Sequence, residues 1–280
     1  MVGRAAPAGS RIKLRVLDTH TEGEPTRIVL SGWPNLKGRT VVDRRNDQIK
    51  RFDWLRTALL LEPRGHSDQF GAVLVPPASR EADFGVFFMD AAGYLDMCGH
   101  ATMGLTCALI ECGKVKARGG AATVTYDTPA GLVRAHAKIR HDGLEVVTVE
   151  DVPSYAFGSA VVKVDGEPVP VEFAYGGNVT AIVDASHLGV PVRQSHLRAL
   201  LERGIAVMSA VKDQADLPWS RSRLGATDLV MLTGDPELPG SDGKNIVVFG
   251  SGQFDRSPCG TGTAARLALL YAQGRLRPRQ

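Results

Sequence analysis

One short pattern occurs twice in this chain. It reads Cys-Gly-x-x-Thr, first at residues 98–102 and again at residues 259–263. Each copy opens an apolar stretch rich in Ala and Leu that stops at a glycine, Gly113 or Gly274. The offset from cysteine to glycine is 15 residues in both copies (113 − 98 and 274 − 259). This is about four helical turns, and glycine is favoured just past a helix end, so the pattern predicts two equivalent apolar helices.

Strand-like segments precede each predicted helix. They lie at 13–17, 26–30, 71–75 and 85–89 in the first half and at 179–183, 228–232 and 245–249 in the second. Strands with one apolar helix per half predict an α+β fold of two similar domains, each a barrel-like sheet wrapped around its helix. We place the domains at 11–150 and 151–280, because residues 150–154 interrupt the strand-like segment at 144–149.

The two halves differ after their helices. The first half continues through 123–126 and 132–139, which are typical of a hairpin around the turn at 127–131. After Gly274 only six residues follow (280 − 274). The second domain is therefore expected to be short at its C-terminus by about one hairpin.

Composition and charge exclude several classes of protein. Hydrophobic residues make up 44% and charged residues 22%, as in ordinary globular proteins. The net charge is only +3, which argues against a nucleic-acid partner. A run of basic residues indicates the solvated face of a helix: Arg44, Arg45, Lys50, Arg51 and Arg56.

The sequence also bears on location. No segment approaches the ~18 consecutive apolar residues of a membrane span. Residues 1–10 lack the build of a signal peptide. We therefore expect no membrane partner and a cytoplasmic protein.

The four cysteines are too few for a disulfide scaffold and form no CxxC pair. Three of the seven histidines, His20, His66 and His100, could be imagined as ligands but have no ligand spacing, so no metal is expected. Residues 260–265 match the G-x-G-x-x-A fingerprint of dinucleotide sites, but no acidic residue follows Asp255. The sequence therefore predicts no cofactor.

Cys98 and Cys259 each stand at a predicted helix start. A helix N-terminus binds carboxylates and lowers the pKa of a thiol placed there. If the domains face each other across a cleft, one thiolate could take a proton from a carbon next to a carboxylate while the other thiol returns a proton to the opposite face. The alternative is that both cysteines are small buried hydrophobes, which is how we interpret Cys107 and Cys112.

The neighbours of the two cysteines suit such chemistry. His100 lies two residues into the first helix, and Asp255 stands four residues before Cys259. A carboxylate beside the ammonium group of a substrate would hold it by a charge-assisted hydrogen bond.

Four segments resemble the proline racemase family: residues 18–25, 62–66, 97–100 and 255–263. The resemblance spans about residues 14–274. The family includes proline racemases, 4-hydroxyproline 2-epimerases and trans-3-hydroxyproline dehydratases. The resemblance implies a diaminopimelate-epimerase-like fold of two pseudo-symmetric domains and two-thiol chemistry that needs no cofactor.

The resemblance also implies roles for particular residues. Cys98 and Cys259 would be catalytic, the backbone of Gly99, His100, Gly260 and Thr261 would hold the substrate carboxylate, and His100 and Asp255 would lie near the ring nitrogen. Dehydratases of the family carry Thr in place of the second cysteine, so Cys259 favours racemisation or epimerisation.

Several functions stay open. Residues 101–104 resemble those of epimerases, so 4-hydroxyproline 2-epimerase is the first prediction. Proline racemase, trans-3-hydroxyproline dehydratase and a non-catalytic imino-acid-binding protein are the alternatives. The expected partner is a small imino acid, and a homodimer is open as the assembly.

Overall fold

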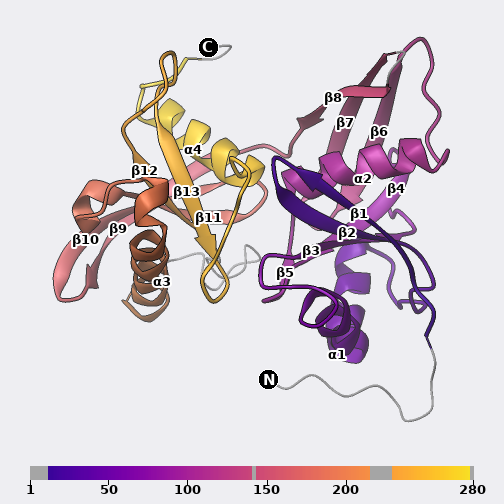
Figure 1. Ribbon diagram of the computed structural model, residues 1–280, viewed down its shortest axis with the longest axis horizontal. Coiled ribbons are helices and arrows are strands. Elements are labelled where there is room, and N and C mark those ends of the chain that lie inside the picture. The colour runs from indigo at the N-terminus through magenta and orange to yellow at the C-terminus, as the bar shows by residue number, and fades with distance from the viewer. Residues whose placement is uncertain (1–11, 141–142, 215–228, 278–280) are drawn as a thin grey trace. The chain divides into compact units, whose positions relative to one another are not determined.

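The computed structural model describes residues 12–140, 143–214 and 229–277 (Figure 1). The chain divides into two units, the first ending at Val152 and the second beginning at Pro153. Each unit is a curled sheet with a helix against each face.

The described residues of the first unit form eight strands and two helices. The strands are β1 (Arg15–Thr21), β2 (Glu24–Ser31), β3 (Phe70–Val75), β4 (Phe84–Met89), β5 (Tyr94–Leu95), β6 (Ala121–Thr128), β7 (Gly131–Arg140) and β8 (Gly143–Glu150), and the helices are α1 (Val41–Leu60) and α2 (Gly99–Glu111). The sheet order is β1-β2-β3-β4-β6-β7-β8, with β5 beside β4. The pairs β2–β3 and β4–β6 are parallel and the rest are antiparallel.

The sheet of the first unit wraps around α2. The helix contacts β1 and β2 at one end of the strand order and β7 and β8 at the other, which requires the sheet to curl (Figure 1). Neighbouring side chains of a strand point to opposite faces. Phe87 and Phe88 of β4 are both fully buried, and Phe87 packs with Leu60 of α1. The sheet is therefore buried on both faces, against α1 on one and α2 on the other.

In the second unit, the described residues form six strands, two α-helices and two 3₁₀ turns. They are β9 (Tyr155–Val164), β10 (Glu167–Tyr175), β11 (Val179–Asp184), β12 (Leu229–Gly234), β13 (Lys244–Phe249), β14 (Gln253–Phe254), α3 (Leu197–Gln214) and α4 (Gly260–Ala272), with the 3₁₀ turns η1 (Ala185–Leu188) and η2 (Gln194–His196). The sheet order is β14-β13-β12-β11-β10-β9. Leu200 and Val207 of α3 pack with Phe173 and Leu232 on one face, whereas α4 contacts β9, β10 and β11.

The two units repeat one topology. Going from β1 to β5, successive strands pair antiparallel, parallel, antiparallel and antiparallel, and the same order holds from β10 to β14. The parallel step is connected by α1 in one unit and by α3 in the other, and α2 and α4 each follow the last strand. The repeat thus extends from a five-residue motif to five strands and two helices, and the predicted α+β fold with a sheet around a helix in each half is confirmed.

Some predictions differ from the structure. The apolar helix predicted in each half is present as α2 or α4, and each unit also contains a second helix, α1 or α3. The hairpin after the first helix is confirmed as β6 and β7. Residue 228, the start of one predicted strand, lies outside the described residues. In the described part of the chain, α4 is followed by residues 273–277 and no strand.

The sequence predicted that the basic residues of α1 form a solvated face, but two of them are largely buried. Arg56 is only 8% exposed, because it pairs with Asp53 and donates to two backbone carbonyls. Arg45 is also largely covered and pairs with Asp96.

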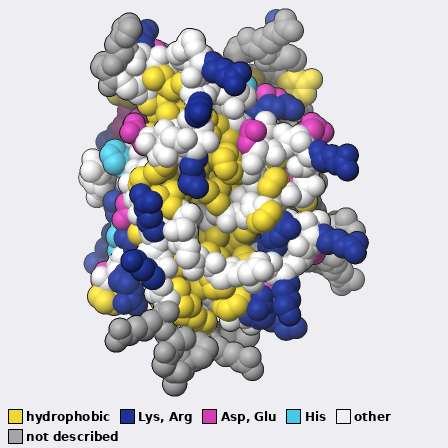
Figure 2. All heavy atoms as spheres, turned by 90° about the vertical axis from the view of Figure 1, so that its right-hand side faces the viewer, with side chains coloured by type: hydrophobic (Ala, Val, Ile, Leu, Met, Phe, Trp, Pro, Cys, Tyr) yellow, Lys and Arg dark blue, Asp and Glu magenta, His cyan; other side chains and the backbone are white. Residues whose placement is uncertain are grey.

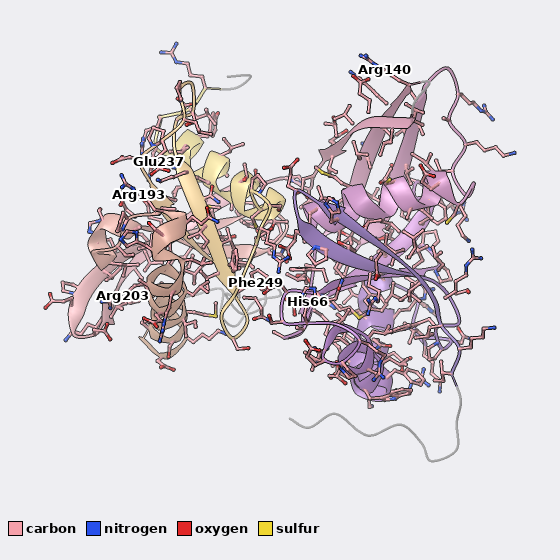
Figure 3. All side chains as sticks on the ribbon, in the orientation of Figure 1. His66, Arg140, Arg193, Arg203, Glu237 and Phe249 are labelled. Atoms are coloured by element: carbon pink, nitrogen blue, oxygen red, sulfur yellow. The ribbon has the colours of Figure 1, made fainter. Side chains whose placement is uncertain are left out.

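Lys and Arg side chains are spread among uncharged ones on the face of the molecule seen in Figure 2 and form no single patch there. Ion pairs join surface loops: Arg193, ahead of η2, and Glu237, after β12, lie side by side (Figure 3), with 3.0 Å between Nε and Oε1. Among the helices that the structure describes, none combines the length and hydropathy of a membrane span.

Candidate active site

Cys98 is the N-cap of α2. Its backbone is extended (φ −146°, ψ 111°), and its side chain is 5% exposed. The first bond of the helical ladder runs from the N–H of Thr102 to the carbonyl of Cys98, at 3.0 Å. The N–H groups of Gly99 and His100 therefore precede the ladder, where a helix presents donors to an anion.

His100 lies directly beside the thiol of Cys98. Nδ1 of His100 is 3.4 Å from the sulfur and Nε2 is 3.7 Å from it. The imidazole is buried, packs edge-on against Phe70 with 4.6 Å between ring centroids, and its backbone carbonyl accepts a hydrogen bond from Thr21. Burial lowers the pKa of His100 to about 3, so the ring is neutral at pH 7 and can form a hydrogen bond with the sulfur.

Cys259 is the N-cap of α4 but has a different backbone. Its φ is +62°, in the left-handed region that costs an L-residue free energy. The N–H of Cys259 donates to Oγ of Ser257 at 3.2 Å, and the N–H of Ser257 donates to Oδ1 of Asp255 at 2.8 Å. These two hydrogen bonds fix the backbone of the strained residue. They require an acceptor side chain two residues before Cys259 and another two residues before that, which are Ser257 and Asp255.

The thiol of Cys259 is held in its protonated form. Its side chain is 6% exposed, and it shares a hydrogen bond with the carboxyl of Asp255. Burial raises the pKa of Cys259, and the negative charge of Asp255 raises it further. Burial also raises the pKa of Asp255 itself, against the hydrogen bonds from Ser257.

The sulfur of Cys259 lies in a close-fitting surrounding. A Cβ at Gly262 would be 3.0 Å from the sulfur and 2.8 Å from Cε of Met231, so a side chain there would have to displace one of the two. Oγ1 of Thr261 is 3.8 Å from the sulfur and accepts a hydrogen bond from Asn178 at 3.4 Å. The turn at 176–178, between β10 and β11, thus lies against the start of α4.

The two helices match at their ends as well as at their starts. Each has 13 residues, and each is followed by a left-handed glycine, Gly113 (φ +68°) or Gly274 (φ +70°). In both, the glycine N–H and the next N–H return to the last turn, at 2.9 Å in all four bonds, which is the Schellman motif. The helix ends predicted from the sequence are confirmed.

The structure thus forms two groups from the predicted site residues. The first unit brings together Cys98, Gly99 and His100, and the second brings together Asp255, Cys259, Gly260 and Thr261. Sequence reasoning did not assign Ser257, Gly262 or Asn178 to the site. The sequence does hold a signal for Gly262. Glycine is unfavourable within a helix, so a glycine three residues after the cysteine indicates a close contact at that position.

The chemistry of the donors does not suggest a metal. In the described ranges, no three or more His, Cys, Asp or Glu side chains gather in a way that could hold a metal ion. All four cysteines are free thiols. Each group instead offers one buried thiol, one titratable neighbour and a helix N-terminus.

Comparison with known proteins identifies the family of the chain. The family profile described as proline racemase matches residues 16–280. A proline racemase from Acetoanaerobium sticklandii is 37% identical over 268 residues, which cover 94% of this chain and 80% of that protein. A 4-hydroxyproline 2-epimerase from Streptosporangium roseum is 40% identical over 267 residues, covering 93% of this chain and 79% of that protein.

A solved structure is similar throughout. The hydroxyproline epimerase from Agrobacterium vitis, with bound trans-4-hydroxy-L-proline, is 28% identical and superposes with a TM-score of 0.85, covering 95% of this chain and 79% of that one. Since the family profile and these relatives cover nearly all of both units, the chain belongs to the proline racemase family and is an isomerase of the amino-acid racemase and epimerase class.

Proposed function

We propose that this protein inverts the α-carbon of 4-hydroxyproline by a two-base mechanism in which Cys98 and Cys259 are the bases. The observation that carries the proposal is the duplicated helix start: each unit has one buried cysteine as the N-cap of a matching helix. The names of the relatives at 37–40% identity support an imino acid as substrate.

In one direction of the reaction, Cys98 is the base that removes the α-proton and Cys259 is the acid that returns one. The Cys98 thiol gives its proton to solvent before the substrate is bound, because the N-terminus of α2 favours the thiolate and the neutral imidazole of His100, 3.4 Å from the sulfur, can donate its N–H to it. The Cys98 thiolate then removes the α-proton, breaking a C–H bond and forming an S–H bond. The electron pair stays on the α-carbon and the adjoining carboxylate.

Cys259 completes the inversion. Burial and Asp255 keep its proton in place, so it can donate that proton to the opposite face of the α-carbon and become a thiolate. This step requires both sulfurs to reach the same carbon from opposite sides. Asp255 would pair with the positively charged ring nitrogen of the substrate, which would weaken its effect on Cys259 and ease formation of that thiolate.

The helix starts would stabilise the charge that develops. The N–H groups of Gly99 and His100 precede the ladder of α2, and those of Gly260 and Thr261 hold the same place in α4. Donors fixed in advance toward the substrate carboxylate lower the barrier because they do not reorganise during the reaction.

Turnover in D₂O tests the proposal. The protein is incubated separately with trans-4-hydroxy-L-proline, L-proline and trans-3-hydroxy-L-proline, and the α-deuterium and optical rotation are followed. We expect deuterium at C2 and inverted rotation with 4-hydroxyproline, at a higher kcat/KM than with proline. A cyclic imine formed from trans-3-hydroxy-L-proline alone would instead identify a dehydratase.

Cysteine variants locate the chemistry. Cys98→Ser and Cys259→Ser are each expected to abolish inversion, because a serine hydroxyl is far too weakly acidic for the exchange. Cys107→Ser is the matched control: it lies within α2, away from the helix start, and should retain activity. Binding of pyrrole-2-carboxylate, a planar analogue of the carbanion-like state, without α-deuterium in any substrate would indicate a binding protein.

A further inference from the structure

The backbone that leads into Cys98 is anchored to α1. After β4, residues 90–97 form a turn, the short strand β5 and an extended stretch that ends at the N-cap. β5 pairs with β4 through Leu95 and Phe88, and Met97 is buried. The position of the Cys98 sulfur therefore depends on how residues 90–97 are held.

Two arginines of α1 hold this segment: Arg45 pairs with Asp96, and Arg56 holds the turn at its start. Nη1 of Arg56 donates to the carbonyl oxygens of Asp90 at 3.1 Å and Ala91 at 2.6 Å. Its Nε and Nη2 donate to the two carboxylate oxygens of Asp53, at 2.8 and 3.1 Å. One guanidinium thus holds the turn and the helix at once, with the fork geometry that lysine lacks.

Tyr94 closes the same network from within the segment. Its hydroxyl donates to Oδ1 of Asp53 at 2.8 Å, and its ring lies 5.6 Å from Cζ of Arg56. Gln48 of α1 donates to the Tyr94 hydroxyl at 3.4 Å and to the carbonyl of Phe52 at 2.8 Å, where the helix departs from helical geometry. Side chains of α1 therefore hold both the turn and β5.

We propose that Arg56 is a positioning residue for Cys98: through Asp53 and Tyr94 it fixes the segment 90–97 and thereby the place of the sulfur. Arg56 acts through the backbone of residues 90–97. Its effect on turnover rests on the proposed function of Cys98, whereas its effect on the thiol does not.

A matched pair of variants on one helix tests this proposal. Arg56→Lys removes the fork. Arg51→Lys is the control, since Arg51 also lies on α1, pairs with Asp47, donates to a backbone carbonyl (Asn35, 3.2 Å) and lies over an aromatic ring (Phe52, 4.4 Å). Arg51 has these contacts away from residues 90–97.

Alkylation of the folded, full-length protein by iodoacetamide gives the readout, with Cys98 and Cys259 followed by peptide mass spectrometry in the same sample. We expect Arg56→Lys to raise the rate at Cys98 relative to Cys259 about tenfold, because loosening the segment opens a buried thiol. Arg51→Lys should leave the ratio unchanged. An unchanged ratio in Arg56→Lys, or an equal change in Arg51→Lys, would overturn the proposal.

Tyr94→Phe keeps the test decisive if Arg56→Lys does not fold. It removes only the hydroxyl, and the expected increase is about fivefold, as for one buried hydrogen bond; no increase would overturn the proposal. In the turnover assay, Arg56→Lys should lower kcat about tenfold or more with KM nearly unchanged, because displacing a base costs rate and not binding. If the wild-type protein shows no turnover, the proposed function fails while the alkylation ratio still decides this one.

Discussion

The sulfur of Cys98 lies 3.4 Å from Nδ1 of His100, on an imidazole that burial keeps neutral. The imidazole of the pair is therefore uncharged, and the two residues do not form a thiolate–imidazolium ion pair. This has a measurable cost for the folded protein in acid.

The stability of the protein should fall in acid partly because of His100. Its pKa is about 3 in the folded protein against an ordinary value of 6.5, so only the unfolded chain binds this proton between those values. The contribution of His100 is fully present above pH 6.5 and is lost as pH falls toward 3. It amounts to about 1.4 kcal/mol per pH unit at most.

Urea unfolding at pH 7, 6, 5 and 4 checks this for wild type and His100→Gln. Carboxylates contribute equally to both proteins, so the difference between their plots of unfolding free energy against pH is due to His100. Parallel slopes would show that the imidazole takes up its proton in the folded state.

Asp255→Asn should make the Cys259 thiol more acidic. Burial and then the charge of Asp255 raise the pKa of Cys259, and the amide removes the charge while retaining an acceptor. The pH profile of Cys259 alkylation should shift to lower pH, with the profile of Cys98 unchanged. Glu237→Gln, an exposed carboxylate of the same unit, is the control and should leave both profiles in place.

Gly262→Ala should lower turnover without loss of stability. The added methyl group would lie 3.0 Å from the Cys259 sulfur and 2.8 Å from Cε of Met231, and the methionine end can move. Alanine favours the helix interior by about 1 kcal/mol, which offsets the crowding. We expect kcat to drop about tenfold or more with an unfolding midpoint close to wild type; full activity would show that the sulfur tolerates displacement.

Gly104→Ala should destabilise the first unit by about 1–3 kcal/mol. A Cβ at Gly104 of α2 would lie 2.4 Å from Oγ1 of Thr19 in β1. Thr19→Ala removes that oxygen, so the double variant should recover at least half of the loss in a double-mutant cycle. If the losses of the two single variants are additive, the destabilisation by Gly104→Ala does not come from the contact with Thr19.

The repeated helices were predictable because their signals are local. A cysteine at the start, an apolar run and a glycine 15 residues on specify the same helix in both halves, wherever the rest of the chain lies. The β9–β10 hairpin has a local signal too, the Asp165-Gly166 turn with positive φ at both residues, which the sequence reading did not use. The helix α3 has charged residues between its buried Leu200, Val207 and Met208, and this amphipathic pattern is also a local signal for a helix.

Other features depend on tertiary partners and have no local signal. The burial of Arg56 follows from two carbonyls 34 and 35 residues away in the chain. The left-handed backbone of Cys259 is fixed by Ser257 and by the packing of Gly262 on Met231, which no spacing rule specifies. The sequence could thus identify which residues form each group, but not which of them carries strain.

Because Cys98 and Cys259 differ in backbone conformation, a substitution has a different effect on stability at the two positions. At Cys98 the chain is extended, so L-residues other than proline can replace it without backbone strain. At Cys259 the φ of +62° favours glycine or asparagine, and cysteine persists there against its own conformational preference. Substitutions that stabilise the fold are therefore within easy reach at position 259, and each of them removes the thiol.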